Sequence, residues 1–416
     1  MQTSCLSRYA GMLAAGLSLS ACHTPPPRDD VATMDAHEDA RVAEDTRDVP
    51  RVRESGAFEA SCEPAPPLRE SPLGGNPGCS GCVQAWPSLP RELFTVRERD
   101  GEFEVPARDY ISYFRPGDPN FRLMNSSLEQ GVRGLCPRNF APSTFGMSGE
   151  QIIFNCFGDA TETGFRMFLS TLSADRRTTC RVAEVYRETL GFAPNRLMRV
   201  PGAYAWVEGY QSSGPGDLTI LDDGSSEPRR FTHCNCMLEA GAADDTIVYI
   251  RDSEVGMQQF AELWTLRPPY QTPQRVWAAG YTMQWLRQDP TDHHRFVFAA
   301  SREGCEAGAD IFVFDSRTIA RDPPQNITRN ASTQTEPVLR GDWIAYLDYS
   351  RDTLNPNGCV SDRHNALDRV MHNMVTGQRV VINSPGGAAI AYIGTTHVLV
   401  GNGWYVPLPA GVTVTP

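Results

Sequence analysis

The sequence predicts an all-β protein built from repeats of short strands, and three observations support this prediction. The segment from Asp244 to Trp277 reads as an apolar strand, a polar loop, a second strand, a turn and a third strand. The same order returns along the chain, and no stretch shows the sustained period of a helix. The first apolar strands of successive repeats lie about 40 to 50 residues apart, centred near Ile153, Ala205, Val248, Val297 and Ile344.

This period is typical of a β-propeller, in which each four-stranded blade buries its faces against its neighbours. A further strand can be placed before several repeats, such as "TMQWLRQD" before His294, and it completes the set of four. Weaker copies begin near Asp109 and near Ala388. We therefore expect a propeller domain over residues 86–416, with seven blades, or six if the first copy is only a closing strand.

The repeats also resemble those of a known family. The segments "IVYIRDSE", "AELWTLRPPYQTPQRVW", "FVFAASREG", "ADIFVFDS" and "PQNIT" are similar to the repeats of the TolB-like, or WD40-like, β-propeller family. The similarity spans roughly residues 109 to 383 and lies in the repetition of these segments. The W-S-P-D-G turn of the family is absent, so the resemblance implies the propeller fold and not a role in the Tol system.

Residues 1–21 have the features of a lipoprotein signal peptide. Arg8 precedes an apolar stretch over residues 9–19, which is too short to cross a bilayer. The motif "LSAC" resembles a bacterial lipobox, which implies cleavage before Cys22 and lipidation of its thiol. The alternative is a plain signal peptide that is cut near Ala21. Because His23 rather than Asp follows the Cys, we expect the outer membrane of a bacterial cell envelope rather than the inner one.

Residues 22–85 are expected to form the lipidated Cys and a disordered tether. The segment is rich in Pro, and up to Glu70 it carries twelve acidic and six basic side chains after the Cys. Such a composition cannot bury enough apolar surface to offset the entropy lost on ordering. A flexible chain of this length has an end-to-end distance of roughly 45 Å. The propeller is therefore expected to stand off the membrane and to contact it through the anchor alone.

The charge composition excludes some classes of function. The chain has a net charge of −12, which argues against nucleic acid as a partner because phosphate contacts need basic patches. All 38 basic residues are Arg, since the sequence contains no Lys. A phosphate-loop Lys and a Schiff-base Lys are therefore both excluded.

An Arg followed by an acidic residue stands directly after the second strand in three successive repeats. In each of these repeats an acidic residue also begins the next strand, at Glu262, Asp310 and Asp368. One interpretation is structural: a cross-strand Arg–carboxylate pair closes each hairpin and contributes a few tenths of a kcal/mol. The other is functional, with a ring of charges facing a ligand. The candidate residues for this binding face are Arg251, Asp252, Arg302, Glu303, Arg351 and Asp352.

The connections between second and third strands are predicted to be long loops, among them "SREGCEAGAD" and "DYSRDTLNPNGCVSDRHNALD". Loops on a rigid scaffold tend to carry binding residues, and the acidic side chains here suit a cationic partner or Ca²⁺. No D-x-D-x-D-G calcium loop is present, so we expect no metal and no cofactor.

Ten cysteines remain after cleavage besides Cys22, an even number for an oxidising compartment. Cys305 and Cys359 lie in equivalent loops of adjacent repeats and are the candidate disulfide pair. The motif "CSGC" at Cys79 could form a redox pair, and "THCNCM" near Cys234 could bind zinc. A structural disulfide is favoured for "CSGC" because the motif lies beside the tether with no βαβ context. It is favoured for "THCNCM" because a closed zinc site needs four ligands and no second ligand cluster is evident.

These observations predict a monomeric, lipid-anchored envelope protein that binds another protein or an envelope polymer through its long-loop face, without catalysis of its own. The alternative is a propeller enzyme, such as a lyase or a glycosidase, with its active site in the central channel. The sequence contains neither H-E-x-x-H nor G-x-S-x-G, so no catalytic residue can be assigned.

Overall fold

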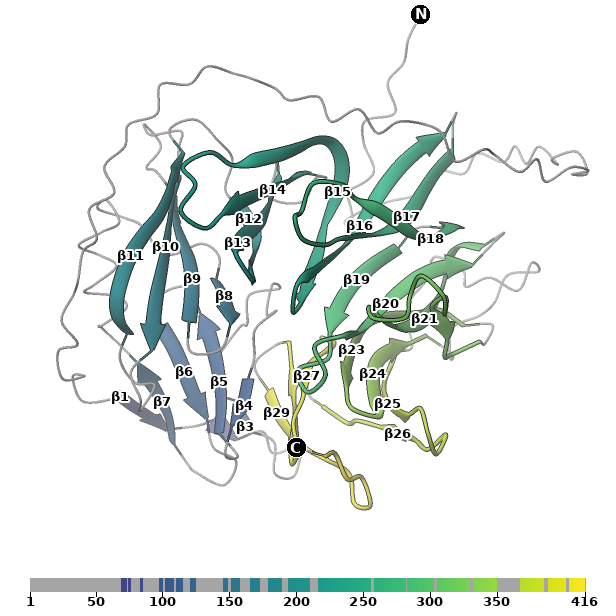
Figure 1. The fold of residues 1–416 in the computed structure, drawn as a ribbon. Helices are drawn as coiled ribbons and strands as arrows, with labels where there is room; N and C mark the ends of the chain where they lie inside the picture. Colours follow the sequence, from purple (N-terminus) through teal and green to yellow (C-terminus); the bar gives the residue numbers. More distant parts are fainter. Residues whose placement is uncertain are drawn as a thin grey trace, which may run out of the picture. The chain divides into compact units, whose positions relative to one another are not determined.

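The computed structural model describes strands between Arg69 and Glu188 and longer stretches from Pro194 onward. These stretches are residues 194–209, 216–255, 258–281, 283–302, 305–329, 332–349, 367–384, 388–401 and 404–415. All of them lie in the compact unit Val42–Pro416. Every element in this described part is a strand, and every strand pairing is antiparallel (Figure 1). The prediction of an all-β fold is confirmed.

The strands form six hydrogen-bonded sheets. The first has the order β1 (Arg69–Pro72), β7 (Asn120–Met124), β6 (Tyr110–Phe114), β5 (Glu102–Ala107) and β4 (Arg97–Arg99). The second has the order β11 (Thr179–Glu188), β10 (Phe165–Leu172), β9 (Gln151–Phe157) and β8 (Phe145–Ser148). The third runs in chain order through β12 (Pro194–Val200), β13 (Ala203–Gly209), β14 (Gly216–Asp222), β15 (Arg229–Ala243), β16 (Thr246–Val255), β17 (Gln258–Leu266) and β18 (Gln274–Tyr281).

The remaining three sheets contain the C-terminal strands. One consists of β19 (Met283–Gln288), β20 (Arg295–Arg302), β21 (Cys305–Asp315) and β22 (Gln325–Asn326). The next consists of β23 (Gln334–Arg340), β24 (Trp343–Asp348), β25 (Asp368–Asn373) and β26 (Arg379–Val381). The last has the order β2 (Gly74–Gly75), β3 (Val83–Gln84), β29 (Trp404–Pro407), β28 (His397–Val400) and β27 (Ile390–Ile393).

Side chains of the second strand of a repeat point alternately into two different cores, which shows that successive sheets pack face to face. Ile247 of β16 belongs to the core shared with β12–β14, and Val248 belongs to the core shared with β19 and β20. In β20, Phe296 lies in the same core as Val248, whereas Val297 packs with Ile344 of β24. Burial on both faces explains why these strands are continuous apolar runs rather than alternating ones. This stacking of four-stranded units is the β-propeller arrangement that the sequence predicted.

The seven-stranded sheet contains two successive repeats that share β15. Arg229 to Phe231 of this strand pair with β14, and Ala240 to Ala243 pair with β16. The strand therefore ends one four-stranded unit and begins the next. Gly241 lies where the second of these two repeats packs against β20. A Cβ atom at this position would come within 2.8 Å of the Phe296 ring, so the close approach needs glycine.

Strands from the two ends of the chain meet in the last sheet. Val83 of β3 pairs with Tyr405 of β29, so the N-terminal segment supplies strands to the C-terminal repeat (Figure 1). The sequence predicted four strands after Ala388, and the structure has three there, completed by β3. β1, β2 and β3 also fall inside residues 22–85, the predicted tether. The blade count and the domain division stay predictions, because the side chains around the first sheet lie outside the described residues.

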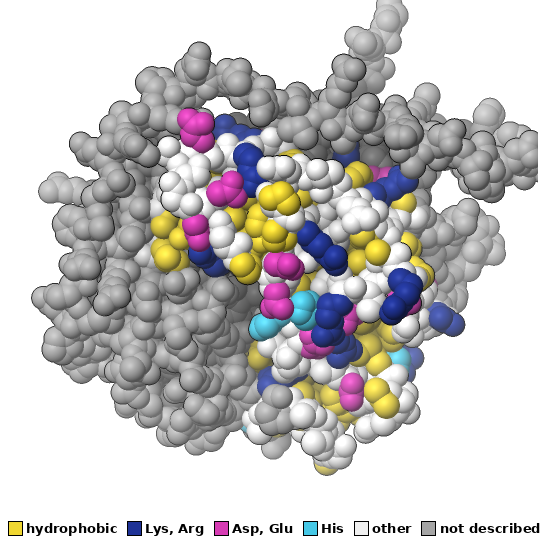
Figure 2. Space-filling view, in the orientation of Figure 1, with side chains coloured by type: hydrophobic (Ala, Val, Ile, Leu, Met, Phe, Trp, Pro, Cys, Tyr) yellow, Lys and Arg dark blue, Asp and Glu magenta, His cyan; other side chains and the backbone are white. Residues whose placement is uncertain are grey.

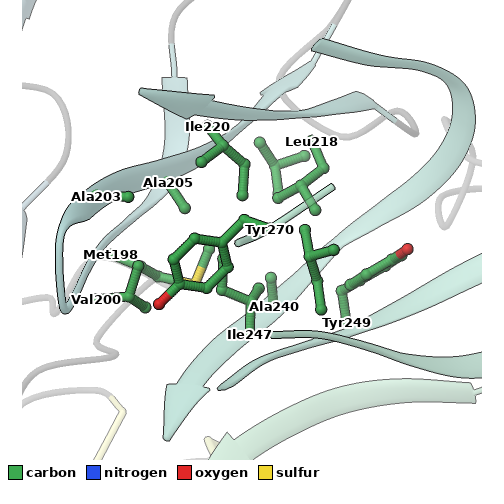
Figure 3. Packing of buried hydrophobic residues seen from close by; sticks show 12 residues of the cluster. Met198, Val200, Ala203, Ala205, Leu218, Ile220, Ala240, Ile247, Tyr249 and Tyr270 are labelled. Atoms are coloured by element: carbon green, nitrogen blue, oxygen red, sulfur yellow. The ribbon is translucent and has the colours of Figure 1, made fainter. Parts of the chain in front are cut away.

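Tyr270 shows how a turn residue completes the core between two repeats. It follows β17, is buried, and lies beside Met198 and Val200 of β12 (Figure 3). Its hydroxyl donates a hydrogen bond to the Pro201 carbonyl oxygen at 3.3 Å. Burial raises the pKa of Tyr270 to about 12. The residue therefore fills apolar volume and links two turns at the same end of the sheet.

Candidate functional site

The structure describes only part of the predicted binding face. Arg251 lies in β16 with its side chain described, whereas Asp252 and Arg302 lie in β16 and β20 with side chains outside the described residues. The three other residues of the face, Glu303, Arg351 and Asp352, lie outside the described residues altogether, as do Cys22 and Cys359. Cys305 begins β21, and its side chain is not among those described, so its pairing with Cys359 stays a prediction.

Two of the predicted long loops are instead paired strands. β16 and β17 remain in register from Ile247 opposite Leu266 to Val255 opposite Gln258. β20 and β21 pair in register up to Ser301 opposite Ala309 and then, after a register shift, at Arg302 opposite Cys305. The prediction of polar loops at these two places was wrong, because hydrogen bonding between the strands continues through their polar residues. Side chains on such hairpins are held at defined positions along the strands.

Arg251 and Glu262 lie directly opposite each other across β16 and β17, as the hairpin interpretation required. The contacts of Glu262, however, are to other residues. Its Oε2 accepts a hydrogen bond from Trp264 Nε1 at 3.0 Å, and its Oε1 forms an ion pair with Arg275 Nη1 at 3.0 Å. The guanidinium of Arg251 lies over the Trp264 ring, 5.2 Å from its centroid. Glu262 is thus tied to the outer strand β18 rather than to the Arg that faces it.

The next repeat departs further from the predicted pairing. A register shift between Ser301 and Arg302 places Arg302 opposite Cys305, and Asp310 lies opposite Ala300. Asp310 is buried and accepts hydrogen bonds from Asn326 Nδ2 at 2.8 Å and from Thr328 Oγ1 at 3.3 Å. Arg302 and Asp310 are therefore not directly opposite each other, and because the Arg302 side chain lies outside the described residues, their pairing stays a prediction.

In the third repeat, the acidic residue with side-chain hydrogen bonds and an ion pair is Asp348. The sequence interpretation missed this residue. It ends β24 opposite Asp368 of β25 and is buried. Its carboxylate accepts hydrogen bonds from Ser332 Oγ at 2.9 Å and Gln334 Nε2 at 3.2 Å, and pairs with Arg379 Nη2 at 2.7 Å. The sequence signal for it was weak, because a single Asp at the end of an apolar run also fits a simple strand end.

The other end of the sheets, away from the β16–β17 and β20–β21 hairpins, has polar side chains that connect neighbouring repeats. Arg229 Nη1 donates to the Tyr270 carbonyl oxygen at 2.7 Å, and His294 Nε2 lies 2.9 Å from Asp244 Oδ2. Each contact joins a turn of one repeat to the repeat beside it. Figure 2 shows acidic and basic side chains interspersed over the described part of the face that it draws. At this end of the sheets, these side chains therefore help to hold neighbouring repeats together.

Two titratable groups are perturbed by burial near these clusters. Desolvation raises the pKa of Tyr249 above its ordinary range, an effect that Arg251 opposes and Glu262 adds to. Burial and the nearby Arg379 lower the pKa of His372, so its ring tends to be neutral. Among the described residues no group of three or more His, Cys, Asp or Glu side chains is arranged to hold a metal ion. A helix long and apolar enough to span a membrane is likewise absent from the described part of the chain.

No protein-family model and no curated protein matches the sequence. Solved structures do match the fold. An oligogalacturonate lyase in complex with manganese is 11% identical, with a TM-score of 0.50, and the match covers 84% of this chain and 99% of the lyase. TolB from Acinetobacter baumannii is 14% identical, with a TM-score of 0.36, and the match covers 75% of this chain and 78% of TolB.

A puromycin-hydrolyzing peptidase from Mycobacterium tuberculosis is 12% identical, with a TM-score of 0.45. The match covers 79% of this chain and 56% of the peptidase, so the chain spans little more than half the length of that protein. At these identities the likeness concerns the fold alone.

Proposed function

We propose that the protein is a lipid-anchored cell-envelope β-propeller that binds another protein or an envelope polymer through the end of its sheets where β16–β17 and β20–β21 form hairpins. The single observation that carries this proposal is that both hairpins continue through polar residues, β16–β17 without a register shift to Val255 opposite Gln258, and β20–β21, after a shift at Ser301, to Arg302 opposite Cys305. The paired backbone fixes the positions of Arg251, Asp252 and Arg302 along β16 and β20, and a fixed spacing of charged residues suits recognition of an extended partner.

The contrast between the two ends of the sheets supports this choice. Arg229 and His294 bridge neighbouring repeats at the turn end, as described above. The Arg–acid step recurs in the sequence of three repeats, and the described parts of two of these steps lie toward the hairpin ends of β16 and β20. The proposed anchor at Cys22 would hold this scaffold at the membrane, on the outer rather than the inner membrane of a bacterial envelope.

The test is cross-linking in intact cells that produce the full chain. The hairpin variant carries Asp252→Arg and Arg302→Glu, and the control carries Arg321→Asp and Asp322→Arg, which reverse an exposed Arg–Asp pair in the turn between β21 and β22. We expect the wild type and the control to give the same discrete adducts or the same co-sedimentation with polymer. The hairpin variant should lose them. Adducts that do not depend on the hairpin residues would refute the proposal.

A second candidate function is that of a propeller enzyme of the lyase or glycosidase type. The observation that favours it is the fold likeness to the oligogalacturonate lyase, which extends over 99% of that protein. Incubation of the purified full chain with oligogalacturonate, with and without added manganese, separates the two candidates. Release of unsaturated products would favour the enzyme, and intact oligogalacturonate would favour the binding protein.

A further inference from the structure

Arg251 is a partly buried cation whose hydrogen-bonding capacity is incompletely used. Its Nε atom is buried and has no hydrogen-bond partner in the part of the chain that the structure describes. The guanidinium instead stacks over the Trp264 ring at 5.2 Å. An unsatisfied buried donor costs free energy, more so on a charged group, and such groups call for a role beyond packing.

Three neighbours on the same face of the sheet complete a charge group, which comprises Arg251, Glu262, Trp264 and Arg275. Glu262 is 11% exposed and is fixed by Trp264 and Arg275, as described above. Arg275, on the outer strand β18, is 57% exposed. The group therefore runs from a partly buried guanidinium through a fixed carboxylate to an exposed guanidinium at the edge of the sheet.

Tyr249 lies at the inner end of this group. It is buried in the core between two repeats, and its hydroxyl points away from the centre of that core (Figure 3). Both Arg251 and Glu262 act electrostatically on this hydroxyl. Tyr249 thus bounds the inner end of the group, and a ligand at Arg251 would have a carboxylate and two guanidinium groups within one short stretch of strand surface.

We infer that the charge group is a binding subsite for the carboxylate of an acidic sugar, such as a uronate in an envelope polysaccharide. This inference rests on the proposed binding function and selects the polymer over the protein as its partner. A guanidinium binds a carboxylate through charge-assisted hydrogen bonds, and Arg251 and Arg275 can both supply them.

The composition of the group favours an acidic sugar over an acidic peptide. Each carboxylate oxygen has two lone pairs, so Glu262 can accept from ligand hydroxyls while it keeps Trp264 and Arg275. Sugar hydroxyls are donors that match this acceptor, and a uronate also carries the anion for Arg251. The side chains of an oligo-glutamate would supply carboxylates for Arg251 and Arg275 but no hydroxyl donor for Glu262.

The experiment measures binding of an oligogalacturonate to the purified full chain by isothermal titration calorimetry. A neutral galacto-oligosaccharide and an oligo-glutamate of matched length serve as competing probes. We expect the wild type to bind the oligogalacturonate in preference to both. Loss of one charge-assisted contact in Arg251→Met should weaken binding about 10-fold to 100-fold and remove the preference for the acidic over the neutral sugar.

Arg251→Lys keeps the charge and should retain part of the affinity, while Arg321→Met, at the exposed turn after β21, should bind like the wild type. A merely structural role would lower the melting temperature of Arg251→Met without changing its preference between the two sugars. The inference is overturned if the wild type binds no oligogalacturonate, binds the neutral sugar or oligo-glutamate equally well, or if folded Arg251→Met keeps the wild-type preference.

The acidic-sugar inference can fail while the proposed binding function holds. Cross-linked adducts that depend on Asp252 and Arg302, combined with no affinity for oligogalacturonate, would leave the binding protein in place and remove the acidic sugar as its ligand.

Discussion

Asp289 offers the sharpest test of how the repeats are held together. The residue follows β19 and its carboxylate is fully buried. Its Oδ1 accepts hydrogen bonds from the Thr291 backbone N–H at 2.9 Å and the Thr291 hydroxyl at 2.7 Å, and its Oδ2 accepts from the Gly341 N–H at 2.9 Å. Gly341 lies in the turn between β23 and β24, so the carboxylate joins two successive sheets. Arg295 Nη1 lies 3.5 Å from Oδ2 and donates to the Gly341 carbonyl oxygen at 2.7 Å.

Asp289→Ala should therefore lower the free energy of unfolding by about 3 to 5 kcal/mol. The substitution leaves the Gly341 N–H and both Thr291 donors without their acceptor, and it removes the counter-charge beside a partly buried Arg295. Asp289→Asn should cost less, about 1 to 3 kcal/mol, because the amide keeps one acceptor oxygen for Thr291, although it loses the bond to Gly341 and the charge beside Arg295.

Urea titration of the full chain, followed by circular dichroism, gives the change in unfolding free energy. Hydrogen exchange at the Gly341 amide gives a local measure, and this amide should exchange faster in both variants while the β16–β17 hairpin is unaffected. Asp322→Ala removes a carboxylate from an exposed pair and should leave the titration midpoint unchanged. A loss below about 1 kcal/mol for Asp289→Ala, with Gly341 protected as before, would refute the idea that this carboxylate joins the sheets.

The remaining predictions concern the anchor, the disulfide and the response to acid. Cys22→Ala should move the protein from the membrane fraction to the soluble fraction, and unchanged fractionation would contradict lipidation. Peptide mapping by mass spectrometry without reduction should recover Cys305 linked to Cys359, and free thiols at both would rule the pair out. Because burial and Arg379 lower the pKa of His372, the unfolded state takes up its proton first, so stability should be full above about pH 6.5 and fall below it. His372→Leu should reduce the difference in unfolding free energy between pH 7 and pH 5, measured by urea titration. An unchanged difference would show that His372 is not its cause.

The strand pattern was predictable from the sequence because its physical cause is local. Runs such as "TIVYI" and "WIAYL" are apolar at consecutive positions, and their return about every 45 residues indicates stacked units of one kind. The structure confirms strands at both, β16 and β24, with both faces of each buried. The prediction that an acidic residue begins the third strand of each repeat is confirmed for Asp368, which begins β25. It was wrong for Glu262 and Asp310, which lie in the middle of β17 and β21 because these strands extend further toward the hairpin.

The partners of those residues depend on register, which the sequence does not specify at a bulge. A shift after Ser301 places Arg302 opposite Cys305, and Glu262 pairs with Arg275, thirteen residues further along the chain. The extension of β16 and β17 through polar residues is a second case, because their hydrogen bonds are made by the backbone whatever the side chains.

The sequence by itself determined the class of the fold, because burial on both faces of a strand leaves a direct mark on its composition. Only the tertiary structure decided that Val83 completes the C-terminal sheet and that Arg251 stacks on Trp264 with a buried Nε atom. Contacts of this kind join residues whose separation in the chain carries no periodic signal, and they form because the packed sheets bring particular side chains within reach.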